Sequence, residues 1–135
     1  MRRRGSYVLI VILDYDKKIE VGALGMLHFP KGMYCYVGSA RGGLDQRLAR
    51  HFAREKPLKW HIDYLTTYAD AVDAYISYPD MIDECDLAFY ALKAGLVVSH
   101  KGFGCSDCHC WTHLFTATDD TLDNLVELAG LTHYE

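Results

Sequence analysis

The first third of the chain alternates apolar segments with short polar turns, a pattern that predicts β-strands joined by tight connections. Residues 6–13 predict a strand buried on both faces, because a continuous, partly β-branched apolar run follows Ser6. Residues 19–21 then predict a short strand that leads into a glycine-rich bend over 22–25. We therefore expect two or three antiparallel strands in this region.

A second long strand is predicted from Met33 onward. Met33, Cys35 and Val37 alternate along it with Tyr34 and Tyr36. Because successive side chains of a strand point to opposite faces, we expect the two tyrosines to face away from the other three residues.

A helical period follows this strand. Leu44, Leu48 and Phe52 recur every four residues and predict a core-facing helix that extends to Arg54. The remaining predicted elements are helices over 60–68 and 81–93 and from Asp119 or Asp120 onward, and strands over 72–78 and 111–115. In the helix over 81–93 the residues expected to face inward are Ile82, Cys85, Phe89 and Leu92.

The order of these elements predicts one domain over residues 1–135. Half of the residues are hydrophobic, which suffices for one sizeable core. The expected class is mixed α/β, of the α+β type, with a small, mainly antiparallel sheet flanked by helices.

Charge is distributed unevenly along the chain. Residues 1–62 carry twelve Lys and Arg against five Asp and Glu, and residues 63–135 carry two against thirteen. Such a chain can present one positive face to a phosphate backbone. On charge alone we favour the simpler explanation, that the two halves neutralise each other on the folded surface, because the overall balance is acidic.

Neither a membrane segment nor a secretory leader is expected. Three arginines precede the apolar run that begins at Tyr7, but this run has seven residues and ends in acidic residues without a cleavage motif. Five cysteines, three of them within six residues, do not form the framework of a secreted module. We expect a cytoplasmic protein with reduced thiols.

Candidate chemistry lies in two tracts and the predicted helix that follows them. Gly5-Ser6-Tyr7 opens the first long strand, Tyr36-Val37-Gly38 lies in the second, and Arg47 and His51 are one helical turn apart. An arginine fork matches the geometry of a phosphate, and a phenol can become a base when a cation lowers its pKa.

This arrangement resembles the core of the GIY-YIG nucleases. The resemblance implies that Tyr7 and Tyr36 are the site tyrosines, that Arg47 grips the phosphate with His51 beside it, and that Glu84 holds Mg²⁺ or Mn²⁺. Tyr7 and Tyr36 are 29 positions apart, farther than the tight hairpin usual in that superfamily, and we attribute this to an extra hairpin around residues 22–25.

A closer resemblance is to an uncharacterised branch of that superfamily, a domain of unknown function found alone or fused to endonuclease III-type DNA glycosylases. The tracts that carry it are 36–40, 60–65, 102–110 and 113–115. It implies a role in DNA repair or processing, with DNA favoured over RNA and a DNA-repair protein as partner.

Basic side chains beside the helix are expected to follow the nucleic-acid backbone. These are Arg41, Arg50, Arg54, Lys56 and Lys59, and His61 is expected to face the same site. Arg47, His51 and Arg54 are expected along one edge of the predicted helix, with Arg50 nearly opposite. Trp60 is either a base-stacking or a core residue.

A second constellation consists of Cys105, Cys108, Cys110 and His113. Thiolates and imidazole are zinc ligands, but four ligands within nine residues leave little chain for a metal to clamp. The favoured alternative is a tight loop whose thiols fill gaps in the core.

The expected function is metal-dependent endonucleolytic hydrolysis of nucleic acid. The alternative is a non-catalytic nucleic-acid-binding or partner-docking module on the same fold.

Overall fold

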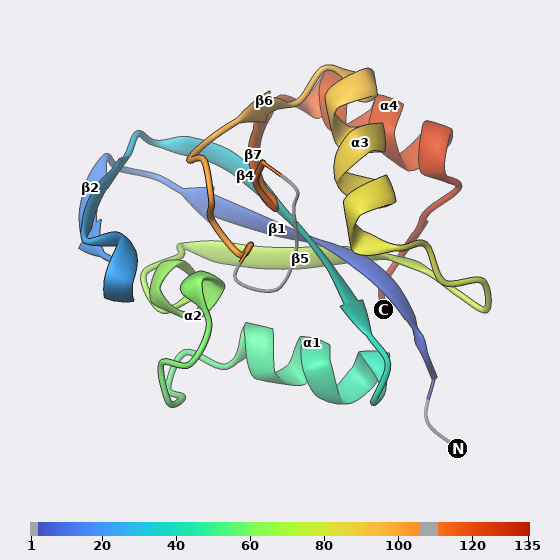
Figure 1. The fold of residues 1–135 in the computed structure, drawn as a ribbon, viewed down its shortest axis with the longest axis horizontal. Helices are drawn as coiled ribbons and strands as arrows, with labels where there is room; N and C mark the ends of the chain where they lie inside the picture. The colour runs from blue at the N-terminus through green and yellow to red at the C-terminus, as the bar shows by residue number, and fades with distance from the viewer. Residues whose placement is uncertain (1–2, 106–110) are drawn as a thin grey trace.

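A six-stranded antiparallel sheet forms the centre of the computed structural model, which describes residues 3–105 and 111–135 (Figure 1). In order across the sheet the strands are β6 (Val97–Val98), β7 (Leu114–Ala117), β4 (Gly32–Ala40), β1 (Gly5–Leu13), β5 (Ala71–Ser77) and β8 (Thr132–His133). The expected fold class, mixed α/β with a mainly antiparallel sheet, is confirmed. The strands predicted over 6–13, 33–39 and 72–78 correspond to the three central strands β1, β4 and β5.

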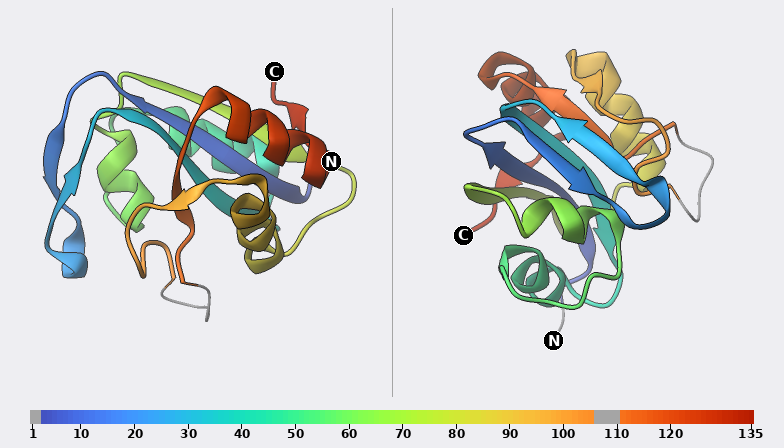
Figure 2. Two further views of the ribbon diagram at one scale, coloured as in Figure 1. Left: turned by 90° about the horizontal axis from the view of Figure 1, so that it is seen from above. Right: turned by 90° about the vertical axis from the view of Figure 1, so that its left-hand side faces the viewer.

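Helices cover both faces of this sheet. One face carries α1 (Leu44–Phe52) and α2 (His61–Thr66), and the other carries α3 (Glu84–Ala94) and α4 (Asp119–Ala129). The two pairs lie on opposite sides of the sheet in Figure 1 and again in the right-hand view of Figure 2. The sheet therefore has a core on each side.

The strand alternation places the side chains as expected. Tyr34 and Tyr36 belong to the core under α1 and α2, whereas Cys35 and Val37 belong to the core under α3 and α4. Strand β1 is buried on both faces in the same way, so that Tyr7 lies on the same side as the two tyrosines of β4.

A hairpin separates β1 from β4. It consists of β2 (Lys17–Glu20) and β3 (Met26–Phe29), joined through the short 3₁₀ helix η1 (Gly22–Leu24). Figure 1 shows it at one end of the main sheet. This hairpin accounts for the long separation between Tyr7 and Tyr36.

Helix α1 is shorter than its period predicted. Leu44 and Leu48 are fully buried, but the helix ends at Phe52, whose side chain is exposed. Arg54 therefore lies beyond the helix and does not share its edge. The expected position of Arg50, nearly opposite Arg47, is also wrong. Three residues turn a helix by about 300°, so Arg50 lies only about 60° from Arg47 around the helix axis.

The inward face predicted for α3 is wrong at Phe89 and Leu92, whereas Ile82, just before the helix, packs against the core as expected. Leu87, Ala88, Ala91 and Ala94 face the core, while Phe89 and Leu92 are exposed. Apolar residues occur all around this helix, so its periodicity does not select one face. Small alanines on the buried face allow α3 to pack closely against the sheet and α4.

Other boundaries also differ from the sequence pattern. The strand predicted over 111–115 is displaced to Leu114–Ala117, and the two-residue strands β6 and β8 were not predicted. Among the residues described, no helix combines the length and the apolar character that crossing a bilayer requires.

Candidate functional site

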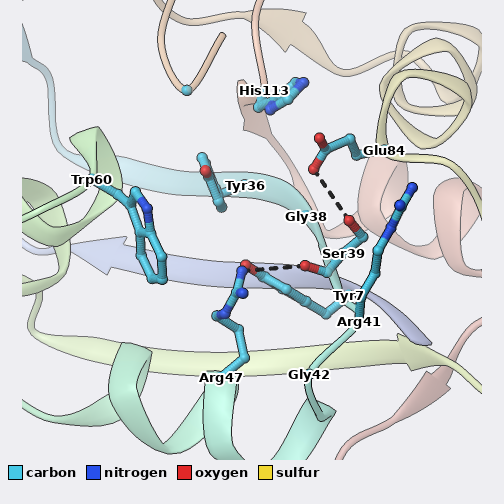
Figure 3. Close-up of a pocket in the computed structure, with 11 residues that line it drawn as sticks. Tyr7, Tyr36, Gly38, Ser39, Arg41, Gly42, Arg47, Trp60, Glu84 and His113 are labelled. Atoms are coloured by element: carbon cyan, nitrogen blue, oxygen red, sulfur yellow. Dashed lines mark hydrogen bonds between the residues drawn. The ribbon is translucent and has the colours of Figure 1, made fainter. Parts of the chain in front are cut away.

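A pocket of about 330 Å³ lies between β1, β4, α1 and the first turn of α3 (Figure 3). The residues that line it are Tyr7, Tyr36, Gly38, Ser39, Arg41, Gly42, Arg47, Trp60, Glu84, Gly104 and His113. The structure thus brings together four side chains singled out in the sequence, namely the two tyrosines, Arg47 and Glu84.

Strand register sets the positions of the two tyrosines. Tyr7 lies opposite Gly38 in the β1–β4 pair, which places Tyr36 on the diagonal and on the same face of the sheet. A Cβ atom on Gly38 would lie 2.5 Å from Cζ and Oη of Tyr7. Glycine is therefore required for the Tyr7 ring to lie against β4.

Tyr7 hydrogen-bonds to His51 behind the pocket wall. Its Oη lies 2.7 Å from Nε2 of His51, a side chain from α1 that is 1% exposed and does not line the pocket. No described residue hydrogen-bonds to Nδ1 of this buried ring. His51 can therefore reach a substrate only through Tyr7.

Burial keeps both members of this pair uncharged. Desolvation lowers the pKa of His51 to about 3, and the positive charges of Lys56, Arg47 and Arg50 act in the same direction. Desolvation also raises the pKa of Tyr7 to about 12, although the nearby Arg47 opposes this shift. At neutral pH a phenol and a neutral imidazole share one hydrogen bond.

Tyr36 is held in its neutral form as well. Burial raises its pKa well above the usual value of 10, and its proximity to Tyr7 and Glu84 adds to the shift. Its ring packs edge-on against His51, Phe103 and His113. The pocket wall is therefore aromatic and uncharged around its phenols.

Arg47 enters the pocket from α1. Its Nη1 donates to the carbonyl oxygen of Ser39 at 3.2 Å, and its guanidinium carbon lies 4.7 Å from the ring centroid of Trp60. Ser39 engages one of the five N–H donors of the guanidinium. This geometry suits the recognition of a phosphate at the pocket.

Glu84 approaches from the opposite side, at the start of α3 (Figure 3). Ser39 Oγ donates to its Oε2 at 3.5 Å, and the preceding residue, Asp83, caps the helix by accepting from Cys85 N at 2.9 Å. The Glu84 carboxylate and the Ser39 hydroxyl thus provide neighbouring oxygen donors on this side of the pocket. Mg²⁺ and Mn²⁺ prefer such ligands, and one carboxylate plus substrate oxygens can hold Mg²⁺.

His113 lies in this pocket, a location that sequence reasoning missed. It is 2% exposed, and burial lowers its pKa while the charge of Glu84 opposes the shift. The sequence singled it out as a zinc candidate and as part of the tract 113–115, and neither signal placed it beside Tyr36 and Glu84.

The described part of the chain does not test the less favoured alternative of a zinc site at Cys105, Cys108, Cys110 and His113. No three His, Cys, Asp or Glu side chains are grouped there to hold a metal, and Cys108 and Cys110 lie outside the described residues. Cys35 is a free thiol and the Cys105 thiol donates to the Phe103 carbonyl oxygen at 3.6 Å, whereas Cys85 is disulfide-bonded. The expectation of reduced thiols is therefore wrong at Cys85.

Two of the basic residues expected on nucleic acid are engaged inside the fold. Arg50 Nη2 pairs at 2.6 Å with Oδ2 of Asp63, a fully buried carboxylate, and its guanidinium carbon lies 4.6 Å from the ring centroid of Trp60. Lys56 Nζ donates to the carbonyl oxygens of Arg50 and His51 at the end of α1. Both stabilise the α1–α2 corner that carries Trp60.

The other basic candidates divide between the pocket and its surroundings. Arg41 lines the pocket and is exposed, and Nζ of the exposed Lys59 lies 5.3 Å from the Trp60 ring centroid. Arg54 lines a separate cavity of about 200 Å³. His61 does not line the pocket. Its Nδ1 accepts a hydrogen bond from Gly104 N at 2.8 Å and so positions Gly104, which does line it.

Comparison with known proteins identifies one family. Searches of curated proteins and of solved structures found no match to the chain. The model of a family described as a domain of unknown function, DUF123, matches residues 6–132. Since that match spans nearly all of the sequence, the protein belongs to the DUF123 family.

Proposed function

We propose that this protein is a metal-dependent endonuclease that hydrolyses phosphodiester bonds of nucleic acid, with DNA favoured over RNA. The observation that carries the proposal is the meeting of Tyr7, Tyr36, Arg47 and Glu84 around one pocket from four separate elements. The resemblance to GIY-YIG nucleases supports the same function, because it singles out these four side chains.

Phosphodiester hydrolysis requires a grip on the phosphate. Arg47 provides a bidentate fork, and the exposed Arg41 lies on the same pocket lining, where it can hold the next phosphate. One divalent cation, Mg²⁺ or Mn²⁺ held by Glu84, would supply the positive charge that stabilises the leaving oxygen.

The attacking water must also lose a proton, and Tyr7 is positioned to orient it. In its resting form Tyr7 is protonated, because its pKa is about 12. Positive charge at the pocket favours the phenolate, which is the form that accepts a proton. His51 is a positioning residue that fixes the Tyr7 hydroxyl through the 2.7 Å hydrogen bond. With a pKa near 3 it is too weak a base to take the proton itself.

The rival function is a non-catalytic nucleic-acid-binding or partner-docking module. The burial of Tyr7 favours this rival, because Tyr7 lines the pocket but is only 2% exposed. A module of this kind needs Arg41 and Arg47 but requires neither Glu84 nor the phenols.

A cleavage screen separates the two functions. Branched, nicked and single-stranded DNA and matched RNA are incubated with Mg²⁺, Mn²⁺ or chelator, and products are resolved by gel electrophoresis. We expect metal-dependent cutting that is lost in Arg47→Ala and in Glu84→Ala. Arg54→Ala is the matched control, because Arg54 lines a different cavity. Binding without cutting, or equal cutting by all four proteins, rejects the nuclease.

The cellular setting belongs to the same proposal. We place the protein in the cytoplasm with a DNA-repair enzyme as its partner, and the resemblance to a branch fused to endonuclease III-type glycosylases supports the partnership. Titration with a purified glycosylase of that type, followed by analytical ultracentrifugation, tests the partnership. Failure to form a complex at micromolar concentrations would argue against it.

A further inference from the structure

We propose that Trp111 and Lys101 form a second contact for nucleic acid, in which an unpaired base of a single strand stacks on the indole beside the Tyr7–Arg47 pocket. The inference rests on the proposed function, in that it specifies which form of nucleic acid the same site receives. Its evidence comes from side chains that have no part in the proposed chemistry.

The starting observation is the exposure of Trp111. The chain has two tryptophans; Trp60 is half-buried and lines the pocket, whereas Trp111 is 69% exposed. Tryptophan offers a large apolar surface, so leaving it in water forgoes much of the stabilisation that burial would bring. An indole held in solvent next to a pocket is therefore a candidate contact for a ligand.

The backbone around Trp111 is tied to the core. Gly102 N donates to the Trp111 carbonyl oxygen at 2.6 Å, and His113 N donates to the Phe103 carbonyl oxygen at 2.9 Å. Phe103 is fully buried and packs against Tyr36 and His61. The backbone of Trp111 and His113 is thus tied by two hydrogen bonds to residues 102 and 103, beside the core.

The same backbone segment reaches the pocket. Gly104 and His113 both line it, and His113 is two residues from Trp111. Two extended residues span at most about 7 Å. A strand of nucleic acid that crosses the pocket from Arg47 to His113 can therefore continue to Trp111.

A cation accompanies the exposed ring. Lys101 Nζ lies 5.1 Å from the centroid of the Trp111 ring. Lys101 is one of two Lys or Arg residues in the acidic stretch 63–135, the other being Lys93, so this pairing does not follow from a generally basic composition. With most of Trp111 exposed, the lysine leaves indole surface free for a base and can neutralise the adjoining phosphate.

These features select a single strand. Stacking on an aromatic side chain requires a base whose face is open, and in a duplex neighbouring base pairs cover those faces. Stacking also tolerates any base, so the contact distinguishes unpaired from paired nucleic acid and does not read the sequence.

The experiment measures binding in the presence of chelator, so that its outcome does not depend on cleavage. Fluorescently labelled dT15, rU15 and a 15-base-pair DNA duplex are titrated with the wild-type protein and with Trp111→Ala, Trp111→Phe and Lys101→Ala. Lys93→Ala is the matched control, because it removes the other cation of the same acidic stretch. Circular dichroism verifies that every variant is folded.

We expect Trp111→Ala to weaken binding of single strands by about 5- to 100-fold and binding of the duplex by less than about 2-fold. Trp111→Phe should retain part of the affinity, and Lys93→Ala all of it. In a Trp60→Phe background the remaining indole, Trp111, should be quenched when dT15 binds. A preference between dT15 and rU15 tells which sugar the site accepts.

Several results would overturn the proposal. These are absence of oligonucleotide binding by the wild type, equal affinity of the wild type and Trp111→Ala, or an equal loss on single strands and duplex. If the wild type and Trp111→Ala bind with equal affinity, the exposed indole does not contact nucleic acid, and contact with a protein remains as the explanation of its exposure. If Trp111-dependent binding is found in a protein that cuts no substrate, the second contact stands and the nuclease proposal fails.

Discussion

The phenolic oxygen of Tyr7 and Nε2 of His51 lie 2.7 Å apart, in a hydrogen bond that links the pocket to the core beneath α1. The sequence places His51 one turn from Arg47 and suggests a side chain beside the phosphate. The structure puts its ring behind Tyr7, where burial lowers its pKa to about 3. Several consequences of this pair can be measured.

Acid should destabilise the protein through His51. Its pKa in the fold, about 3, is below the unfolded value of about 6.5, so the unfolded chain gains a proton first as the pH falls. The stabilisation is therefore complete above pH 6.5 and is lost as the pH drops toward 3. We expect a loss of roughly 3 to 5 kcal/mol over that window, which His51→Gln should lack. Urea unfolding at successive pH values measures it. The exposed His28→Gln is the control, and an unchanged slope in His51→Gln would contradict the assignment.

Cleavage should become faster at alkaline pH if Tyr7 accepts the proton of water. Because its pKa is about 12, only a small fraction of Tyr7 is ionised near neutrality, and that fraction grows about tenfold per pH unit. Single-turnover rates between pH 6.5 and 9.5 should rise accordingly, and Tyr7→Phe should cut at least about 100-fold more slowly. Tyr36→Phe, which keeps Tyr7, should retain the pH dependence. A flat profile in the wild type would exclude phenolate as the acceptor.

The close contact between Gly38 and Tyr7 predicts a sharp response to one methyl group. In Gly38→Ala the new Cβ would lie 2.5 Å from the Tyr7 hydroxyl oxygen, so the ring must leave its position beside His51. We expect destabilisation by about 1 to 3 kcal/mol in urea unfolding, together with loss of any cleavage. Gly42→Ala is the matched control on the same pocket, because a Cβ there meets nothing within 4 Å. Equal stability of the two variants would show that the Tyr7 ring has room to move.

The central strands follow from the sequence because their chemistry is local. The alternation of Tyr34 and Tyr36 with Cys35 and Val37 sets which side chains face each layer, and the structure keeps that division. The fully apolar run of β1 likewise implies burial on both faces.

The helix contacts do not follow, because they depend on how separate elements approach one another. In α3 the large Phe89 is exposed while Ala88 and Ala91 are buried, since close packing on the sheet favours small residues. The burial of His51 and the place of His113 in the pocket arise from segments that meet only in the folded chain.

The ion pair between Arg50 and Asp63 also joins segments that meet only in the folded chain. Arg50 was expected to follow a nucleic-acid backbone, but it pairs with a buried carboxylate instead. Asp63 is fully buried and accepts hydrogen bonds from Arg50, Lys59 N and Trp60 N, at 2.6, 2.9 and 2.8 Å. Removing the arginine would leave a buried carboxylate without its charge partner. We expect Arg50→Ala and Asp63→Asn each to lower the free energy of unfolding by roughly 3 kcal/mol, since the Arg50 side chain is partly exposed.

Arg41→Ala provides the contrast for this last prediction. Arg41 is exposed at the pocket, so its loss should leave urea unfolding unchanged within about 0.5 kcal/mol and should weaken nucleic-acid binding. The number of counterions released on binding, obtained from the salt dependence of the affinity, should also decrease by about one. If Arg50→Ala instead remains as stable as the wild type and loses binding, Arg50 contacts the phosphate backbone and the buried pair is dispensable. Stability and binding measured on the same variants therefore separate the cation that holds the α1–α2 corner together from the one that faces the ligand.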